Sequence, residues 1–314
     1  MALRFAAAAW LALMAPGLAQ ERIAVVTTTT DLRSLTEAVG GEHIAAVSLV
    51  PPNMDAEEYQ PKPQDVLRLK NARMLVRVGL DYDLWADRLL MQAGNPEIGR
   101  GGAGYVDASF AITVLELRGM SVGPGDGHAH GSGNPHYWLD PKNAEIITGT
   151  ILEALARIDP AHAASYEANR AAFLARLQSK LAEWEMKLSS LKGTPIVAYH
   201  NSWPYFARRF RLDFVGFIEM KPGVPASPSH LAKVVWTMRA WSVRIVVREP
   251  HEAKRDVDFV ADKASARVVT LAASVSFPIR QALTASAREM PRGLPHSLPH
   301  VRDRCGQALR GSCR

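Results

Sequence analysis

Apolar and polar positions in the first third of the chain alternate in short blocks that predict strands and helices in turn. Apolar or β-branched runs bounded by Gly, Pro or Asp predict strands at residues 22–30, 45–50 and 74–78. Amphipathic stretches predict helices at residues 31–39, from about 63 onward and at 84–91, and one or two short strands are expected within 105–117. This succession is typical of a parallel sheet with helices on its faces, which binds ligands at the carboxyl ends of its strands.

The same succession returns in the second half of the chain. Apolar runs predict strands at residues 195–199, 214–218, 245–247 and 268–271, and helices are predicted at 229–240 and 253–265. After residue 275 the pattern stops, because residues 276–314 are rich in Arg, Ser, Pro and His and show weak periodicity. We interpret this segment as an atypical tail that is either disordered or the product of a reading-frame shift.

Two helices are predicted between these halves, and the second is unusually long. Asp140-Pro141 marks the start of the first, which runs to about Arg157. The second covers residues 159–193 and carries one apolar stripe, so its roughly 33 residues would span about 50 Å. We interpret it as a helix that joins two lobes rather than as a coiled-coil dimer helix, because the stripe is short for a coiled coil and α/β signals resume beyond it.

The predicted fold class is therefore α/β, with two lobes that each contain a parallel sheet and are joined by one long backbone helix. The expected segments are a signal peptide at 1–19, an N-terminal lobe at 20–158, the linking helix at 159–193, a C-terminal lobe at 194–275 and the tail at 276–314. Arg4, the apolar run after it and the small residues Gly17 and Ala19 predict a cleaved signal and a periplasmic protein. We expect no membrane insertion, because no stretch approaches about 20 apolar residues.

The formal net charge of +6 is concentrated at the two ends of the chain. Residues 277–314 contain seven arginines and two acids, which gives +5, and Arg4 adds one more. Residues 20–276 are therefore neutral overall, and the basic pI gives no reason to expect nucleic-acid binding. Both cysteines, Cys305 and Cys313, also lie in the tail, where they are too few to form a disulfide framework.

Histidines and carboxylates occur in loops that follow predicted strands or precede a predicted helix. They are Glu57 in the segment DAEEY, His136 in NPHYWLDP, His200 after PIVAY, and Glu219 and Glu249 after two strands of the second lobe. Imidazole and carboxylate groups are usual ligands of divalent transition metals. A Gly-rich tract with His128 and His130 comes just before His136 and suggests a loop that recruits metal. A single histidine near aromatic residues is more often structural, so the joint pattern carries the hypothesis of a metal site.

Three motifs in this order resemble the zinc- and manganese-binding solute-binding proteins of ABC importers, the ZnuA-like family. They are the loop DAEEYQPKPQDV, the segment NPHYWLDP and the segment AYHNSWPYFARRFRL. The resemblance covers about residues 23–275 and includes the long joining helix and the His-bearing loop. It implies the metal-type periplasmic binding protein fold, no enzymatic activity, and delivery of metal to an ABC permease from the periplasm. We also expect a monomer.

Carried over to this chain, the resemblance implies that His136 and His200 are metal ligands. The first family ligand is usually His, whereas this chain has Glu57, and the neighbouring Glu58 is an alternative to it. The fourth family ligand is an acid after the last strand of the second lobe, but the loop here reads LAASVS and contains no carboxylate, with Ser274 nearest the expected place. Either Glu219 or Glu249 supplies that acid, or water takes the fourth position. Two histidines favour Zn²⁺ as the transported ion, and Glu57 in place of His favours Mn²⁺ as the alternative.

Other classes of function are less consistent with the sequence. A zinc-dependent hydrolase would use three protein ligands and an open position, but the chain has no HExxH motif and no evident general base. A relative that binds a siderophore or haem could use Arg208 and Arg209, yet it would leave the histidines without a role. An adhesin remains an alternative that the sequence does not address.

Overall fold

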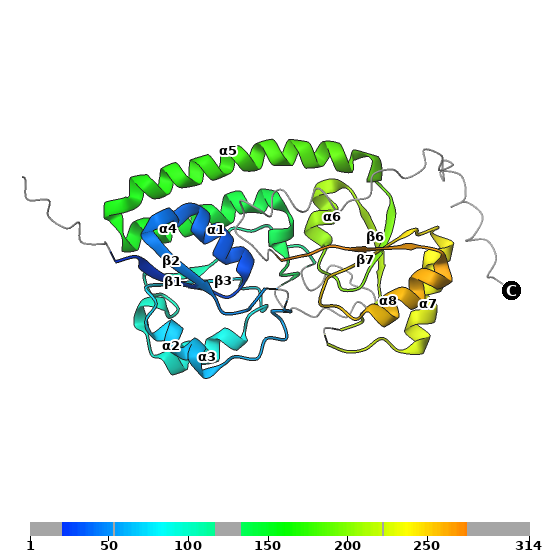
Figure 1. The fold of residues 1–314 in the computed structure, drawn as a ribbon, viewed down its shortest axis with the longest axis horizontal. Helices are drawn as coiled ribbons and strands as arrows, with labels where there is room; N and C mark the ends of the chain where they lie inside the picture. Colours follow the sequence, from blue (N-terminus) through cyan, green and yellow to red (C-terminus); the bar gives the residue numbers. More distant parts are fainter. Residues whose placement is uncertain (1–20, 53, 117–132, 222, 275–314) are drawn as a thin grey trace, which may run out of the picture. The chain divides into compact units, whose positions relative to one another are not determined.

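The computed structural model describes residues 21–52, 54–116, 133–221 and 223–274, which form two compact units (Figure 1). Unit 1 comprises the described residues up to Leu177, and unit 2 comprises those from Gln178 onward. The expected signal peptide at 1–19, the loop with His128 and His130, and the tail at 276–314 lie outside the described residues. In the part of the chain that is described, no helix is both long enough and apolar enough to cross a membrane.

Unit 1 contains a parallel sheet of four strands in the spatial order β2-β1-β3-β4. The strands are β1 (Ile23–Thr27), β2 (Ile44–Ser48), β3 (Met74–Arg77) and β4 (Tyr105–Asp107). Strand β3 is buried along its whole length, as its central position between β1 and β4 requires. The predicted parallel sheet is confirmed, and the region expected to hold one or two short strands contains β4.

Helices cover both faces of this sheet. They are α1 (Thr30–Gly40), α2 (Pro63–Lys70), α3 (Trp85–Ala93) and α4 (Ala144–Ile158). Figure 1 shows α1 and α4 on one side of the strands and α2 and α3 on the other, and each pair is in contact. This division follows from the strand order, because the right-handed connection from β1 to β2 runs in the opposite direction to those from β2 to β3 and from β3 to β4.

Unit 2 repeats this topology with the spatial order β6-β5-β7-β8, again all parallel. Its strands are β5 (Pro195–Ala198), β6 (Asp213–Phe217), β7 (Ile245–Arg248) and β8 (Arg267–Thr270). Its helices are α6 (Pro204–Phe210), α7 (Pro228–Ala240) and α8 (Lys254–Ala264). Helices α7 and α8 share one core with β5 and β7, built from residues such as Val197, Val246, Met238 and Val260.

The predicted long helix is present as α5 (Ala163–Leu188), which contributes residues to both units. It has 26 residues and is shorter than the predicted 159–193, because 3₁₀ turns at Pro160–His162 and Ser189–Leu191 flank it. Its predicted apolar stripe is largely buried, as the residues Tyr166, Phe173, Leu177, Leu181 and Leu188 show. Asp159 does not cap the helix through its side chain but accepts hydrogen bonds from Tyr166 and His162.

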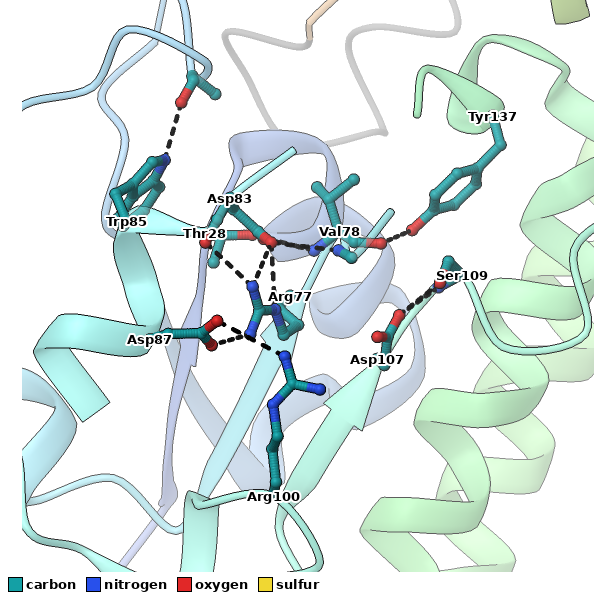
Figure 2. A network of polar contacts seen from close by, with 12 residues as sticks. Thr28, Arg77, Val78, Asp83, Trp85, Asp87, Arg100, Asp107, Ser109 and Tyr137 are labelled. Carbon is teal, nitrogen blue, oxygen red and sulfur yellow. Dashed lines mark hydrogen bonds and ion pairs between the residues drawn. The ribbon is translucent and has the colours of Figure 1, made fainter. Parts of the chain in front are cut away.

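A buried arginine fixes the turn that follows β3 (Figure 2). The guanidinium of Arg77 is 2% exposed and donates to the carboxylate of Asp83, which is 0% exposed, and to that of Asp87. Asp83 also accepts from the backbone N–H groups of Val78 and Gly79, at 2.7 and 3.2 Å. Burial by itself lowers the pKa of Arg77, but Asp83 and the other neighbouring groups raise it above its ordinary value, so the guanidinium stays charged.

The turn held by Arg77 has an uncommon backbone conformation. Gly79, Leu80 and Asp81 all have positive φ angles, of 76°, 49° and 64°. A side chain at Gly79 would also bring its Cβ to 2.2 Å from an oxygen of Asp107, so only glycine fits there. Non-glycine residues with positive φ persist where the surrounding contacts determine them, and the buried ion pair supplies those contacts here.

We predict that Arg77→Met destabilises the protein by about 3–5 kcal/mol, because it leaves Asp83 buried without its charge partner. Arg73→Met is the matched control, since Arg73 pairs with Glu97 where both side chains are about half exposed, and its cost should stay below about 1 kcal/mol. Urea denaturation of the metal-free proteins measures both changes. Equal losses in the two variants would contradict a special role for the buried pair.

Candidate metal site

The segment NPHYWLDP and the two residues after it contain two 3₁₀ turns, Tyr137–Leu139 and Pro141–Asn143, ahead of α4. The sequence predicted an α-helix from Pro141, whereas the α-helix begins at Ala144. Asp140 does cap this start, because its side chain accepts from the N–H of Lys142, although what it caps is a 3₁₀ turn. His136 lies in the loop after β4, directly before the first of these turns, and the turns fix the backbone next to it.

Several contacts hold this segment against the sheet of unit 1. The hydroxyl of Tyr137, which is fully buried, donates to the carbonyl of Val78 at 2.7 Å, and Val78 is the residue directly after β3 (Figure 2). Asn143 donates to the carbonyl of Tyr137. The ring of Tyr82, which follows the strained turn, lies edge-on to His136 with centroids 5.4 Å apart. The ring of Trp138 lies 5.2 Å from His136. The imidazole is thus held between aromatic rings and is 4% exposed.

Asn134 fixes the tautomer of the neutral His136 ring. Its side-chain oxygen accepts from the backbone N–H of His136 at 3.0 Å, and its amide nitrogen donates to Glu116, so the orientation of the amide is determined. The same oxygen lies 3.2 Å from Nδ1 of His136. Because an amide oxygen only accepts, Nδ1 carries the proton and Nε2 of the neutral ring carries the lone pair.

Glu57 is brought to that lone pair by a firmly held loop. Its backbone N–H donates to Asp55 at 2.8 Å, and the carbonyl of Ala56 accepts from the indole of Trp85 at 2.9 Å. The ring of Tyr59 packs on Trp85 and its hydroxyl donates to Asp65. Burial and the bond to Asp65 raise the pKa of Tyr59 to about 12. This arrangement turns Glu57 inward and leaves Glu58 exposed.

In unit 1 a carboxylate oxygen of Glu57 therefore faces Nε2 of His136 at 3.3 Å. Both atoms offer a metal ligand, and both carry lone pairs when the ring is neutral. Two acceptors at this distance repel one another unless a proton or a metal cation lies with them. A buried His and Glu in this arrangement are suited to a divalent transition metal.

Unit 2 presents the second predicted histidine at the carboxyl end of β5. His200 is buried, and its Nδ1 lies 2.6 Å from an oxygen of Glu219, which follows β6. Since an ionised carboxylate only accepts, Nδ1 donates and Nε2 is again the nitrogen with the lone pair. The other oxygen of Glu219 accepts from the N–H of Gly223 at 3.0 Å.

Glu249, the residue after β7, forms a buried pair of acids with Glu252 in unit 2. It accepts from the hydroxyl of Ser202 at 2.7 Å, and its backbone N–H donates to the carboxylate of Glu252. Burial first, and then the charge of Glu249, raise the pKa of Glu252 to about 8. In the loop after β8, the described residues 271–274 contain no carboxylate.

The sequence did not identify three of the groups that surround the candidate ligands. Asn134 lies within the quoted motif, and an Asn two residues before a His is a usable signal for a ring partner. Tyr82 and Glu252 gave no such signal. The position of Tyr82 depends on the strained turn before it, and the raised pKa of Glu252 depends on its burial.

A family model described as zinc-uptake complex component A, periplasmic (ZnuA), matches residues 25–278. The chain belongs to this family. A protein of Treponema pallidum (strain Nichols) described as metal-binding is 30% identical over 255 residues, which are 80% of this chain and 79% of that protein. The high-affinity zinc uptake system protein ZnuA of Brucella abortus (strain 2308) is 25% identical, covering 85% and 89% of the two chains. A crystal structure of ZnuA matches with a TM-score of 0.72 at 26% identity, over 85% of this chain and 98% of that one.

Membership of the ZnuA family establishes the general function. Its members are substrate-binding proteins of ABC importers, periplasmic or extracellular, and they are not enzymes. The protein therefore captures a divalent metal for import and delivers it to an ABC permease. The expected fold class is confirmed as the ZnuA-type fold.

Glu252 leads to a prediction on pH-dependent stability of the metal-free protein. Its pKa of about 8 in the folded state exceeds the ordinary 4.5, so the folded state binds the proton more tightly and loses stability as pH rises from about 4.5 to about 8. Glu252→Gln should therefore raise the free energy of unfolding at pH 8 and have little effect near pH 4.5. Denaturation curves at several pH values measure this, with exposed Glu97→Gln as the control. A pH-independent difference would contradict it.

Proposed function

We propose that the transported ion is zinc and that Glu57, His136 and His200 bind it, with a fourth donor from Glu219 or Glu249. The observation that carries the proposal is the 3.3 Å approach of Glu57 to the lone pair of His136. A cation between two acceptors removes their repulsion and gains two bonds at once. Ligands drawn from both units would make the metal a cross-link that stabilises one closed arrangement.

The chemistry of the donors supports zinc as the ion. Two neutral imidazole nitrogens suit a borderline cation, and Zn²⁺ accepts mixed His and carboxylate ligands in tetrahedral sites. With one glutamate the formal charge of the complex would be +1, and a second carboxylate would bring it to zero. The Brucella abortus relative is named for zinc uptake, which agrees with this choice.

Manganese is the alternative ion, and Glu57 is the residue that favours it. An oxygen donor in place of the usual histidine makes the site harder, which suits Mn²⁺. Metal analysis of protein purified without chelator, followed by competition between zinc and manganese, decides between the two ions. Retention of zinc against a large excess of manganese is the expected result.

We predict that His136→Ala and His200→Ala each weaken zinc binding by more than about 100-fold, since each removes a ligand rather than a group behind a ligand. Isothermal calorimetry, with a competing chelator to reach tight affinities, measures the loss. We expect Glu57→Gln to weaken binding comparably, because it removes the charged oxygen donor.

Two other histidines serve as matched controls, one in each unit. His43 in unit 1 stacks on His162 and contacts Ser165, and His230 in unit 2 contacts the carbonyl of Phe217. His43→Ala and His230→Ala should bind zinc like the unmodified protein. Unchanged affinity in His136→Ala or in His200→Ala would defeat the assignment of that ligand.

A further inference from the structure

We infer that Glu219 is a positioning residue that acts through His200 and is not itself a ligand of the metal. The inference rests on the proposed function, because it concerns how His200 is prepared for the ion. It also decides between the two acids considered for the fourth donor. All of the contacts that support it lie within unit 2.

The first observation is that both oxygens of Glu219 already accept hydrogen bonds. One lies 2.6 Å from Nδ1 of His200, and the other accepts from the N–H of Gly223 at 3.0 Å. The backbone of Glu219 is fixed as well, because its N–H donates to the carbonyl of Tyr199 at 2.8 Å. The backbone of Glu219 is thus tied to the residue directly before His200, and its carboxylate to the ring of His200 and to the N–H of Gly223.

The shape of the imidazole ring then separates Glu219 from the metal. Nδ1 and Nε2 point away from each other, so an oxygen that accepts from Nδ1 lies roughly 6 Å from a metal held about 2.1 Å from Nε2. The second oxygen of the same carboxylate is only about 2.2 Å from the first, so it stays well beyond the distance of a metal–oxygen bond. One carboxylate cannot hold Nδ1 of His200 and also bind a metal at Nε2 of the same ring.

What Glu219 does supply is the orientation and basicity of the ligand. The hydrogen bond selects the tautomer with the lone pair on Nε2, and the negative charge behind the ring strengthens that nitrogen as a donor. His136 has the same arrangement with a weaker partner, since the neutral oxygen of Asn134 occupies the place of the carboxylate. Both histidines therefore present Nε2 as the donor, but the charged partner makes Nε2 of His200 the stronger donor.

Comparison of Glu219→Gln and Glu219→Ala tests the inference. The glutamine keeps an acceptor for Nδ1 and loses only the charge, so zinc affinity should fall by about 10-fold or less, whereas the alanine should lose about 10–100-fold. The positive controls are Glu57→Gln and His200→Ala, each expected to lose more than about 100-fold. Exposed Glu97→Gln should leave the affinity unchanged.

Two spectroscopic measurements separate positioning from ligation. The visible spectrum of the Co²⁺-substituted protein should keep its band positions and intensities in Glu219→Gln, since the donor set is the same. In the metal-free protein, the ¹⁵N chemical shifts of His200 should show a proton on Nδ1 in the unmodified chain and in Glu219→Gln, and a mixture of tautomers in Glu219→Ala. If the alanine variant does not fold, the glutamine variant decides the matter alone.

Two outcomes would overturn the inference. One is a loss of affinity in Glu219→Gln as large as in Glu57→Gln, together with a changed Co²⁺ spectrum. The other is a His200 proton on Nε2 in the unmodified metal-free protein. Failure of the proposed function is distinguishable from both, because it would appear as unchanged zinc affinity in His200→Ala.

Discussion

In unit 1, several separate contacts act together to hold a carboxylate oxygen of Glu57 close to Nε2 of His136. Two acceptors 3.3 Å apart are unfavourable by themselves, so the surrounding structure has to impose their positions. Asn134 holds the far side of the ring, and Tyr82 and Trp138 enclose it. The buried ion pair of Arg77 and Asp83 fixes the strained turn that brings Tyr82 there. A proton or a metal cation between the two groups removes this repulsion, so the fold holds both groups in place for a cation before one binds.

The two units show how one topology prepares a histidine in two ways. Both sheets have the same strand order, so the loop with Glu57 after β2 corresponds to the loop with Glu219 after β6. The two acids nevertheless contact opposite sides of an imidazole. Glu57 faces Nε2 of His136, whereas Glu219 binds Nδ1 of His200. Acids that follow equivalent strands therefore meet different nitrogens of the ring, and under the proposed function this difference would separate a metal donor from a support for one.

The pattern of apolar and polar residues was sufficient to predict most of the strands and helices. Apolar runs and amphipathic stretches identify strands and helices because burial on a sheet or on one helix face imposes a period. The differences occur at element ends, such as Asp140-Pro141 and Asp159-Pro160, where 3₁₀ turns precede the α-helices. At such ends the side chain of the capping residue meets partners that are distant in sequence. Asp159, for example, binds His162 and Tyr166 instead of a backbone N–H of the helix start.

The sequence by itself determined which loops carry candidate donors. Parallel strands place their carboxyl ends at one edge of a sheet, and the motifs contain the histidines of the loops concerned. Only the tertiary structure decided which nitrogen each ring presents and which acid stands before or behind it. Those choices depend on hydrogen bonds of about 3 Å between residues far apart in the chain, such as His200 with Glu219. The same limit applies to Glu252, whose raised pKa arises from burial beside Glu249. Local sequence carries period and residue type, whereas distance and solvent exclusion exist only once the chain has folded.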